Sequence, residues 1–137
     1  MTRVPFKAWH LAALDPVHIQ GRETATLEYG EILEAGGRAY TMLDGGRVIA
    51  CAGILDAGPI GSWLWSYLDQ RTGRAMLRFH RVALELIRSH AGPLRAATAA
   101  GFAPGCRWLE MLGFTLQGTL DAEFPDNPGA LSYLRGA

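Results

Sequence analysis

The chain has 137 residues, 49% of them hydrophobic, and its 13 basic side chains balance 13 acidic ones. A chain of this length suits one domain, so we expect residues 1–137 to form a single core. The zero net charge argues against a dedicated nucleic-acid binder, and two cysteines supply neither a disulfide framework nor a zinc motif. Because no apolar run approaches ~18 residues and the start lacks a signal-peptide core, we expect no membrane association and a cytoplasmic location.

Hydrophobic periodicity and turn residues divide the chain into alternating strands and helices. A period of two predicts strands, a period of 3.6 predicts helices, and Gly, Pro and Asp mark the boundaries. In chain order the predictions are a strand over Phe6–Leu11, helices over Asp15–Gln20 and Glu23–Ala35, a hairpin of Arg38–Leu43 and Arg47–Ile54 about Asp44-Gly45-Gly46, a strand over Ser62–Leu68, a helix over Met76–His90, a strand over Leu94–Thr98, a helix over Pro104–Leu112, and strands over Phe114–Leu120 and Ala130–Arg135. The predicted order is β-α-α-β-β-β-α-β-α-β-β, an α/β arrangement without an internal repeat.

The segment between the strand at 62–68 and the helix at 76–90 has the composition of an anion-binding turn. It reads Gln70-Arg71-Thr72-Gly73-Arg74-Ala75. The first N–H groups of a helix lack intrahelical partners and the helix dipole adds positive charge there, so such a junction attracts phosphate. Glycine at position 73 removes a side chain that would hold a phosphate away. The alternative is an ordinary strand-to-helix turn capped by Thr72.

Two segments of the chain resemble the GNAT superfamily of N-acetyltransferases. The pattern Gln-x-x-Gly-x-Ala over residues 70–75 resembles that family's pyrophosphate loop. The segment Gly105–Phe114, followed by Gln117-Gly118, resembles a block of ribosomal-protein alanine acetyltransferases, and its Arg-Trp-Leu-x-x-Leu-Gly-Phe spacing is similar to that of phage acetyltransferase-like internal head proteins. The resemblance implies the GNAT fold, a mixed α/β sheet splayed between its fourth and fifth strands, with acetyl-CoA as co-substrate.

The resemblance also assigns residues to the coenzyme. The residues that it places there are Tyr67, Leu68, Gln70, Arg71, Thr72, Gly73, Arg74 and Ala75. Backbone N–H groups near Tyr67 and Leu68 are expected to hold the pantetheine arm and polarise the thioester carbonyl. Tyr67 is the candidate catalytic side chain on this strand, with packing as a core aromatic as the alternative. No metal is expected to take part.

Three positions depart from the family pattern. Many members carry Asn at the position of Phe102, Ser at that of Gly105, and a proton-donating Tyr at that of Leu109. Leucine cannot donate a proton, so the usual general acid is missing from its usual place. Cys106 lies one helical turn before Leu109 and is the candidate substitute, with a small helix hydrophobe as the alternative.

One face of the helix at 76–90 and the turn before it carries a charged stripe at helical spacing. Its members are Arg71, Arg74, Arg78, Arg81, Glu85 and Arg88. Three interpretations stay open: a solvated face, contact of Arg71 and Arg74 with coenzyme phosphates, and a docking surface for an acidic partner.

We therefore expect an acyl-CoA-dependent N-acyltransferase acting on an amine of a small molecule or a protein. The alternative is a phage-encoded structural or host-interaction protein, in the host cytoplasm or the virion, that keeps the fold without the activity. The intact turn at 70–75 favours the enzyme, and the missing polar groups favour the alternative. Acceptor pockets in this fold come from variable loops, here Gln20–Thr26 and Asp121–Gly129, so the acceptor is not identified, and a homodimer is left open.

Overall fold

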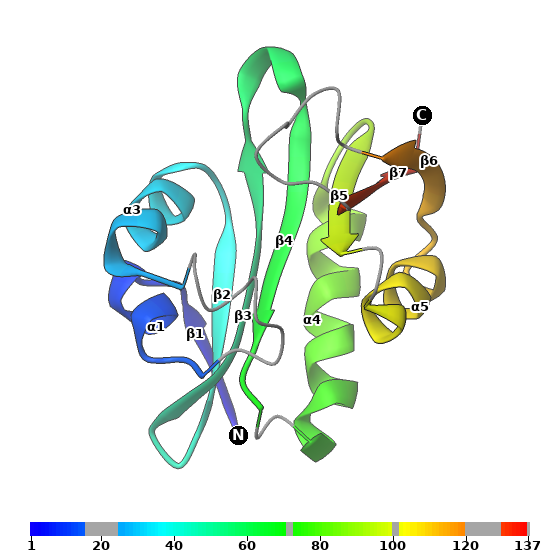
Figure 1. Cartoon of the computed structure of the whole chain (residues 1–137). Helices are drawn as coiled ribbons and strands as arrows, with labels where there is room; N and C mark the ends of the chain where they lie inside the picture. The colour runs from blue at the N-terminus through cyan, green and yellow to red at the C-terminus, as the bar shows by residue number, and fades with distance from the viewer. Residues whose placement is uncertain (16–24, 71–72, 100–101, 120–129, 137) are drawn as a thin grey trace.

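The structure, a computed structural model, describes residues 1–15, 25–70, 73–99, 102–119 and 130–136 (Figure 1). From the helix predicted over Glu23–Ala35 onward, the helices and strands follow the predicted order, and before it lie a strand and a helix that were not predicted at those positions. The elements are β1 (Thr2–Pro5), α1 (Ala8–Ala12), α3 (Leu27–Ala35), β2 (Ala39–Asp44), β3 (Arg47–Asp56), η1 (Gly58–Ile60), β4 (Ser62–Leu68), η2 (Gly73–Ala75), α4 (Met76–Ser89), β5 (Leu94–Ala99), α5 (Ala103–Met111), β6 (Thr115–Thr119) and β7 (Ala130–Arg135), where η marks a 3₁₀ turn. The prediction of an α/β fold is confirmed.

The strands form one mixed sheet in the order β1-β2-β3-β4-β5-β7-β6. Strands β4 and β5 are parallel, and the other neighbours are antiparallel. The hairpin β2–β3 turns through Gly45 and Gly46, whose φ angles of 58° and 81° are those that a two-residue turn between twisted strands requires.

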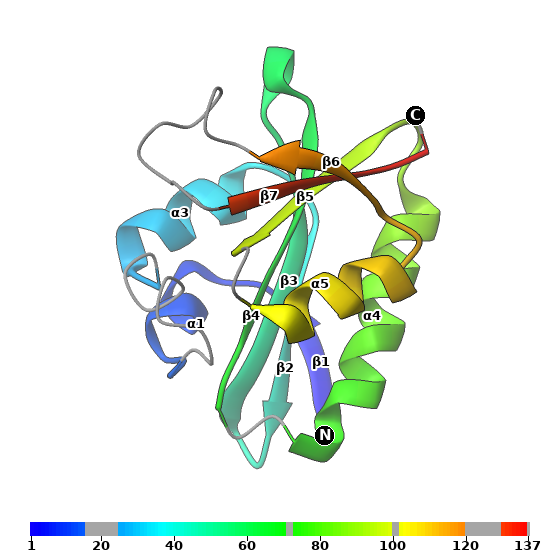
Figure 2. The same ribbon diagram turned by 45° about the vertical axis from the view of Figure 1, so that its right-hand side comes forward.

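Helices cover the two faces of the sheet in separate layers (Figure 2). One core cluster joins α4 and α5 to the sheet around Phe79, Leu86 and Tyr133. The second joins α1 and α3 to it around Leu11 and Leu33. Alternate side chains of the strands contribute to the two clusters, because successive side chains of a strand point to opposite faces of the sheet.

The prediction of a strand over Phe6–Leu11 is wrong, because the chain forms helix α1 from Ala8. Ala8, Leu11 and Leu14 are buried at the three-residue spacing of a helix, while Trp9 is 57% exposed. Helix α1 packs against α3 so closely that a Cβ on Gly30 would lie 2.4 Å from the Ala8 carbonyl oxygen. An apolar–polar alternation over only six residues is compatible with a strand or with a helix, and the contact between α1 and α3 favours the helix here.

Other boundaries differ by a few residues from the predictions. Helix α3 begins at Leu27, because the Thr26 side chain accepts a hydrogen bond from the Tyr29 N–H at 3.2 Å and so caps the helix. The predicted helix that starts at Asp15 lies almost entirely outside the described residues. In the described part of the chain, no helix is long and apolar enough to span a membrane.

Candidate functional site

Strands β4 and β5 separate along their length, which opens the sheet at its centre. They pair at one position, Trp63 with Arg95, whereas β4 pairs with β3 over its whole length and β5 with β7 over its whole length. The pair lies near the start of both parallel strands, and among the described residues no further ladder pair joins them toward their carboxyl ends, where the sheet is open. This is the splay between the fourth and fifth strands that the sequence resemblance implied.

The turn before α4 begins at the wide end of this opening. Gly73 has a φ angle of +46°, which favours glycine, and no atom lies within 4 Å of where its Cβ would stand. The N-cap of α4 is Ala75, which offers no side-chain acceptor, and the first turn carries no acidic residue. The start of this 14-residue helix, which the 3₁₀ turn η2 precedes, therefore lies next to the end of β4 without a side-chain cap from its N-cap residue.

The structure places the predicted coenzyme residues only in part. Gln70 and Arg74 are exposed and Ala75 is buried, whereas Arg71 and Thr72 lie outside the described residues. Leu68 packs into the core cluster beneath α4. The residues that are described lie together around the end of β4, and their contact with a coenzyme stays a prediction.

A buried carboxylate that sequence reasoning missed holds the start of this turn. Asp69 is fully buried, and its carboxylate accepts the Asp15 N–H at 2.9 Å while the Gln70 N–H donates to the Asp15 carbonyl at 2.9 Å. The Asp69 N–H donates to the Ile49 carbonyl, which continues the link to β3. The sequence signal that could have identified Asp69 is a charged residue directly after an apolar strand. These bonds join the chain after α1 to the turn that leads to α4.

Tyr67 lies near the carboxyl end of β4, on the face that α1 and α3 cover. It is half-buried, stands opposite Cys51 in the sheet, and its ring centroid is 6.1 Å from that of Trp65. The alternation predicted for β4 is observed, since Trp65 and Tyr67 join one cluster and Leu64 and Leu68 the other. Tyr67 thus lies on β4, one of the two strands that border the opening.

Cys106 lies beside β5, the other strand that borders the opening. Its Sγ is 4.0 Å from the carbonyl oxygen of Ala99, the last residue of β5, and the residue is half-buried. The buried Tyr133 of β7 is its neighbour: burial raises the pKa of Tyr133 to about 12, and the Cys106 side chain adds to that rise. A phenol and a thiol therefore lie together beside β5, and Tyr133 was not identified from the sequence because β7 reads as an ordinary strand.

The departures from the family pattern have structural reasons here. A Cβ on Gly105 would lie 2.4 Å from Oγ1 of Thr98 and 2.7 Å from the Phe102 ring, so α5 packs too closely on β5 for a serine. Leu109 is 5% exposed and belongs to the core. The N-terminal part of α5 is built for packing at these positions.

A hydrogen bond between α4 and α5 fixes the helices that flank the opening. The Trp108 indole N–H donates to Nδ1 of His80 at 3.0 Å, and its ring stacks on Phe79 with centroids 5.6 Å apart. Because Nδ1 accepts this bond, the proton of a neutral His80 resides on Nε2. In the part of the chain that is described, no group of three or more His, Cys, Asp or Glu side chains could hold a metal ion.

The fold is similar to those of solved acetyltransferase structures. The structure of Ard1 from Thermoplasma volcanium matches with a TM-score of 0.73 and 16% identity over 98% of this chain and 95% of that one. A GNAT-family acetyltransferase from Staphylococcus aureus Mu50 matches with a TM-score of 0.70 and 15% identity over 98% of this chain and 97% of that one. A Bacillus subtilis acetyltransferase in complex with CoA matches with a TM-score of 0.56 and 13% identity over 75% of this chain and 78% of that one. No protein-family model matches the sequence, and no curated protein is significantly similar to it. The chain therefore has the GNAT fold.

Proposed function

We propose that the protein is an acetyl-CoA-dependent N-acyltransferase that acetylates an amine of a small molecule or a protein in the cytoplasm. The proposal rests on one arrangement, in which β4 and β5 part toward the Gly73 turn and the uncapped N-terminus of α4. It is supported by a fold shared with acetyltransferases, one of them crystallised with CoA. The site fits such a coenzyme, because the space beside Gly73 is open and the helix N–H groups there suit a phosphate.

Each part of the site has a role in this proposal. The backbone of the turn at 70–75 and the Arg74 guanidinium would hold the pyrophosphate, together with Arg71 and Thr72. The edge of β4 near Tyr67 and Leu68 would hold the pantetheine arm. When bound, acetyl-CoA supplies the acetyl group as an activated thioester. The buried bonds from Asp69 to Asp15 keep the turn at a fixed distance from the chain that follows α1.

The transfer forms a C–N bond to the amine and breaks the C–S bond of the thioester. The amine nitrogen therefore loses a proton, which water accepts, and the departing sulfur gains one. Leu109 can do neither, so we assign the proton for the sulfur to the Cys106 thiol, with the Tyr133 phenol behind it. Tyr67 lies on β4, the opposite strand, where a polar group beside the thioester is needed.

A second candidate is a catalytically weak or silent protein with the same fold, phage-encoded and residing in the host cytoplasm or the virion. The observation that favours it is the replacement of all three usual polar groups, by Phe102, Gly105 and Leu109. The close packing at Gly105 supports a structural role for this part of α5.

Calorimetric titration with acetyl-CoA, followed by a CoA-release assay against a panel of amines and peptides, separates the two candidates. Saturable binding with amine-dependent release of CoA supports the enzyme. Binding without acetylation of anything in the panel, with the protein present stoichiometrically in particles, supports the silent protein. An absence of binding at millimolar acetyl-CoA would show that the coenzyme site is assigned wrongly.

A further inference from the structure

A groove of about 400 Å³ lies between α4 and the first two strands of the sheet. Its lining residues are Met1, Arg3, Met42, Arg78, Arg81, Val82 and Glu85. Strands β2 and β3 separate β1 from β4, so the groove is distinct from the opening between β4 and β5. Its ligand is not the coenzyme of the proposed function, and the inference below stands whether or not acetyl transfer is found.

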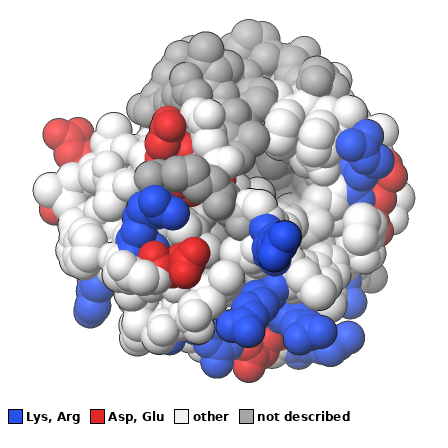
Figure 3. All heavy atoms as spheres, turned by 90° about the horizontal axis from the view of Figure 1, so that it is seen from below, with Lys and Arg blue, Asp and Glu red and all other residues white. Residues whose placement is uncertain are grey.

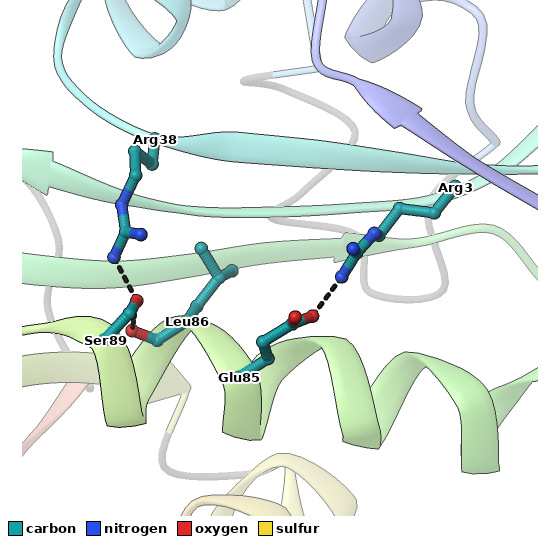
Figure 4. Close-up of polar contacts among 5 residues, drawn as sticks. All are labelled: Arg3, Arg38, Glu85, Leu86 and Ser89. Atoms are coloured by element: carbon teal, nitrogen blue, oxygen red, sulfur yellow. Dashed lines mark hydrogen bonds and ion pairs between the residues drawn. The ribbon is translucent and has the colours of Figure 1, made fainter.

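At one end of the groove an ion pair joins β1 to α4 (Figure 4). Arg3 of β1 forms an ion pair with Glu85 of α4, and its guanidinium lies 4.7 Å from the centroid of the Tyr40 ring. One turn further along α4, Arg38 donates to the Ser89 hydroxyl, which in turn donates to the Leu86 carbonyl at 2.8 Å. The ion pair with Glu85 and the contact with the Tyr40 ring hold Arg3 in place, and the ion pair compensates its charge.

The other end of the groove carries two guanidinium groups that form no ion pair in the described part of the chain, with Glu85 four residues beyond Arg81 on the same helix. Arg78 and Arg81 are exposed and, among the described residues, make no ion pair or hydrogen bond. They stand three residues apart on one face of α4, near its N-terminus, where both their mutual repulsion and the helix dipole disfavour cations. Basic side chains gather along one margin of this end of the molecule in Figure 3. An anion bound between the two arginines would remove the repulsion.

We propose that this groove docks an acidic, extended peptide segment of a partner protein. Carboxylates pair bidentately with guanidinium groups, which suits Arg78 and Arg81. Met42 and Val82, which are 4% and 8% exposed, form a small apolar floor between these charged groups, which an aliphatic side chain of a peptide can contact. Strand β1 is the first strand of the described sheet, so a peptide beside it can add main-chain hydrogen bonds at the sheet edge.

The test is fluorescence anisotropy of the full-length protein with a labelled peptide of alternating glutamate and valine. A peptide of the same length with glutamine in place of glutamate is the matched control. We expect the glutamate peptide to bind more tightly than the glutamine peptide, with an affinity that falls as salt is raised, because the groove is open to solvent. The Arg78→Glu/Arg81→Glu variant should weaken that binding roughly tenfold or more, since it removes two exposed ion pairs and adds repulsion.

Two further variants show whether a loss of peptide binding comes from the groove or from misfolding of the protein. Arg107→Glu reverses the charge of an exposed arginine on α5 that does not line the groove, and it should leave peptide affinity unchanged. Glu85→Gln frees Arg3 and should tighten binding several-fold, a gain that misfolding cannot produce. Equal binding of the two peptides, or unchanged binding by the double arginine variant, would overturn the proposal. Competition by inorganic phosphate against both peptides alike would show a small-anion site in its place.

Discussion

The guanidinium of Arg95 lies 4.3 Å from the centroid of the Trp63 ring, at the one position where β4 and β5 pair. Both side chains also donate to the same acceptor, the Ile60 carbonyl, at 3.0 Å from the indole and 3.2 Å from the guanidinium. The narrow end of the opening is therefore held by a cation–π contact and a shared hydrogen-bond acceptor rather than by a long ladder. This contact joins the two halves of the sheet where they begin to diverge.

Replacing Arg95 should loosen that junction. We expect Arg95→Ala to lower the free energy of unfolding by about 1–2 kcal/mol, the sum of a cation–π contact and a hydrogen bond, and to weaken acetyl-CoA binding because β4 and β5 are no longer held at one separation. Urea unfolding and calorimetric titration measure the two effects. Arg107→Ala, on the exposed face of α5, should change stability by no more than about 0.5 kcal/mol. Equal unfolding free energies for the Arg95 variant and the parent would contradict this role.

Gly73→Glu should abolish coenzyme binding, because it places bulk and negative charge where the pyrophosphate is expected. In the parent, acetyl-CoA at ~100 times its dissociation constant should stabilise the fold by about 2.7 kcal/mol, whereas pantetheine without phosphate should hardly do so. Thermal shift measurements report both. Gly45→Glu is the matched control, because Gly45 also has a left-handed φ and open space around it but lies in the distant β2–β3 hairpin. Both variants should lose roughly 1–2 kcal/mol from backbone strain, and only the Gly73 variant should lose the coenzyme-induced shift.

Cys106→Ser should slow acetyl transfer several-fold with little change in the KM for acetyl-CoA, if the thiol carries the proton. General acid–base groups typically contribute about 10²–10⁴-fold, so the parent itself should turn over slowly without the usual tyrosine. Labelling with a thiol reagent at mildly alkaline pH shows whether Cys106 is accessible, since burial raises the pKa of Cys51, the other cysteine, to about 12. An unchanged turnover number and pH profile in Cys106→Ser would assign the residue to packing alone. Leu109→Tyr is a poor rescue, because Leu109 is buried and a larger side chain overpacks the core.

Gly105→Ser should destabilise the protein although it restores the residue common in the family. The added Cβ meets Thr98 and Phe102 at distances that real contacts do not reach, so α5 must shift. We expect a lower midpoint of urea unfolding for Gly105→Ser and a partial recovery in Gly105→Ser/Thr98→Ala, which removes the atom closest to the new side chain. A midpoint equal to that of the parent would show that α5 accommodates the serine without strain.

The stability of the fold should decline in mild acid because of His10. Burial lowers the pKa of His10 from its usual 6.5, against the raising effect of Glu34, and its Nδ1 accepts the Lys7 N–H at 3.0 Å. The unfolded chain therefore binds a proton on His10 at a higher pH than the folded chain does. Stability is complete above about pH 6.5 and falls as the pH drops from there toward the lowered pKa. Urea unfolding at several pH values should show this slope in the parent and in a His90→Gln control, and a weaker slope in His10→Gln.

The sequence by itself determined the elements whose signals are local. Strand β4 and strand β7 have the predicted bounds, and α4 differs by one residue at its end, because alternation, helical spacing and glycine turns act within a few residues. The proposal that the turn at 70–75 binds an anion also comes from local signals, a glycine, which has a left-handed φ at position 73, and the helix start that follows.

Only the tertiary structure decided what depends on distant partners. Helix α1 replaces the predicted strand because Ala8 packs against Gly30 of α3. The buried carboxylate of Asp69 accepts a hydrogen bond from the N–H of Asp15, which is far from it in the sequence. The contact between Cys106 and Tyr133 likewise joins α5 to the last strand. The acidic-peptide groove likewise unites Arg3 with a helix far along the chain. Burial and charge pairing depend on which surfaces meet, so these features follow from the packing of the sheet and not from any local pattern.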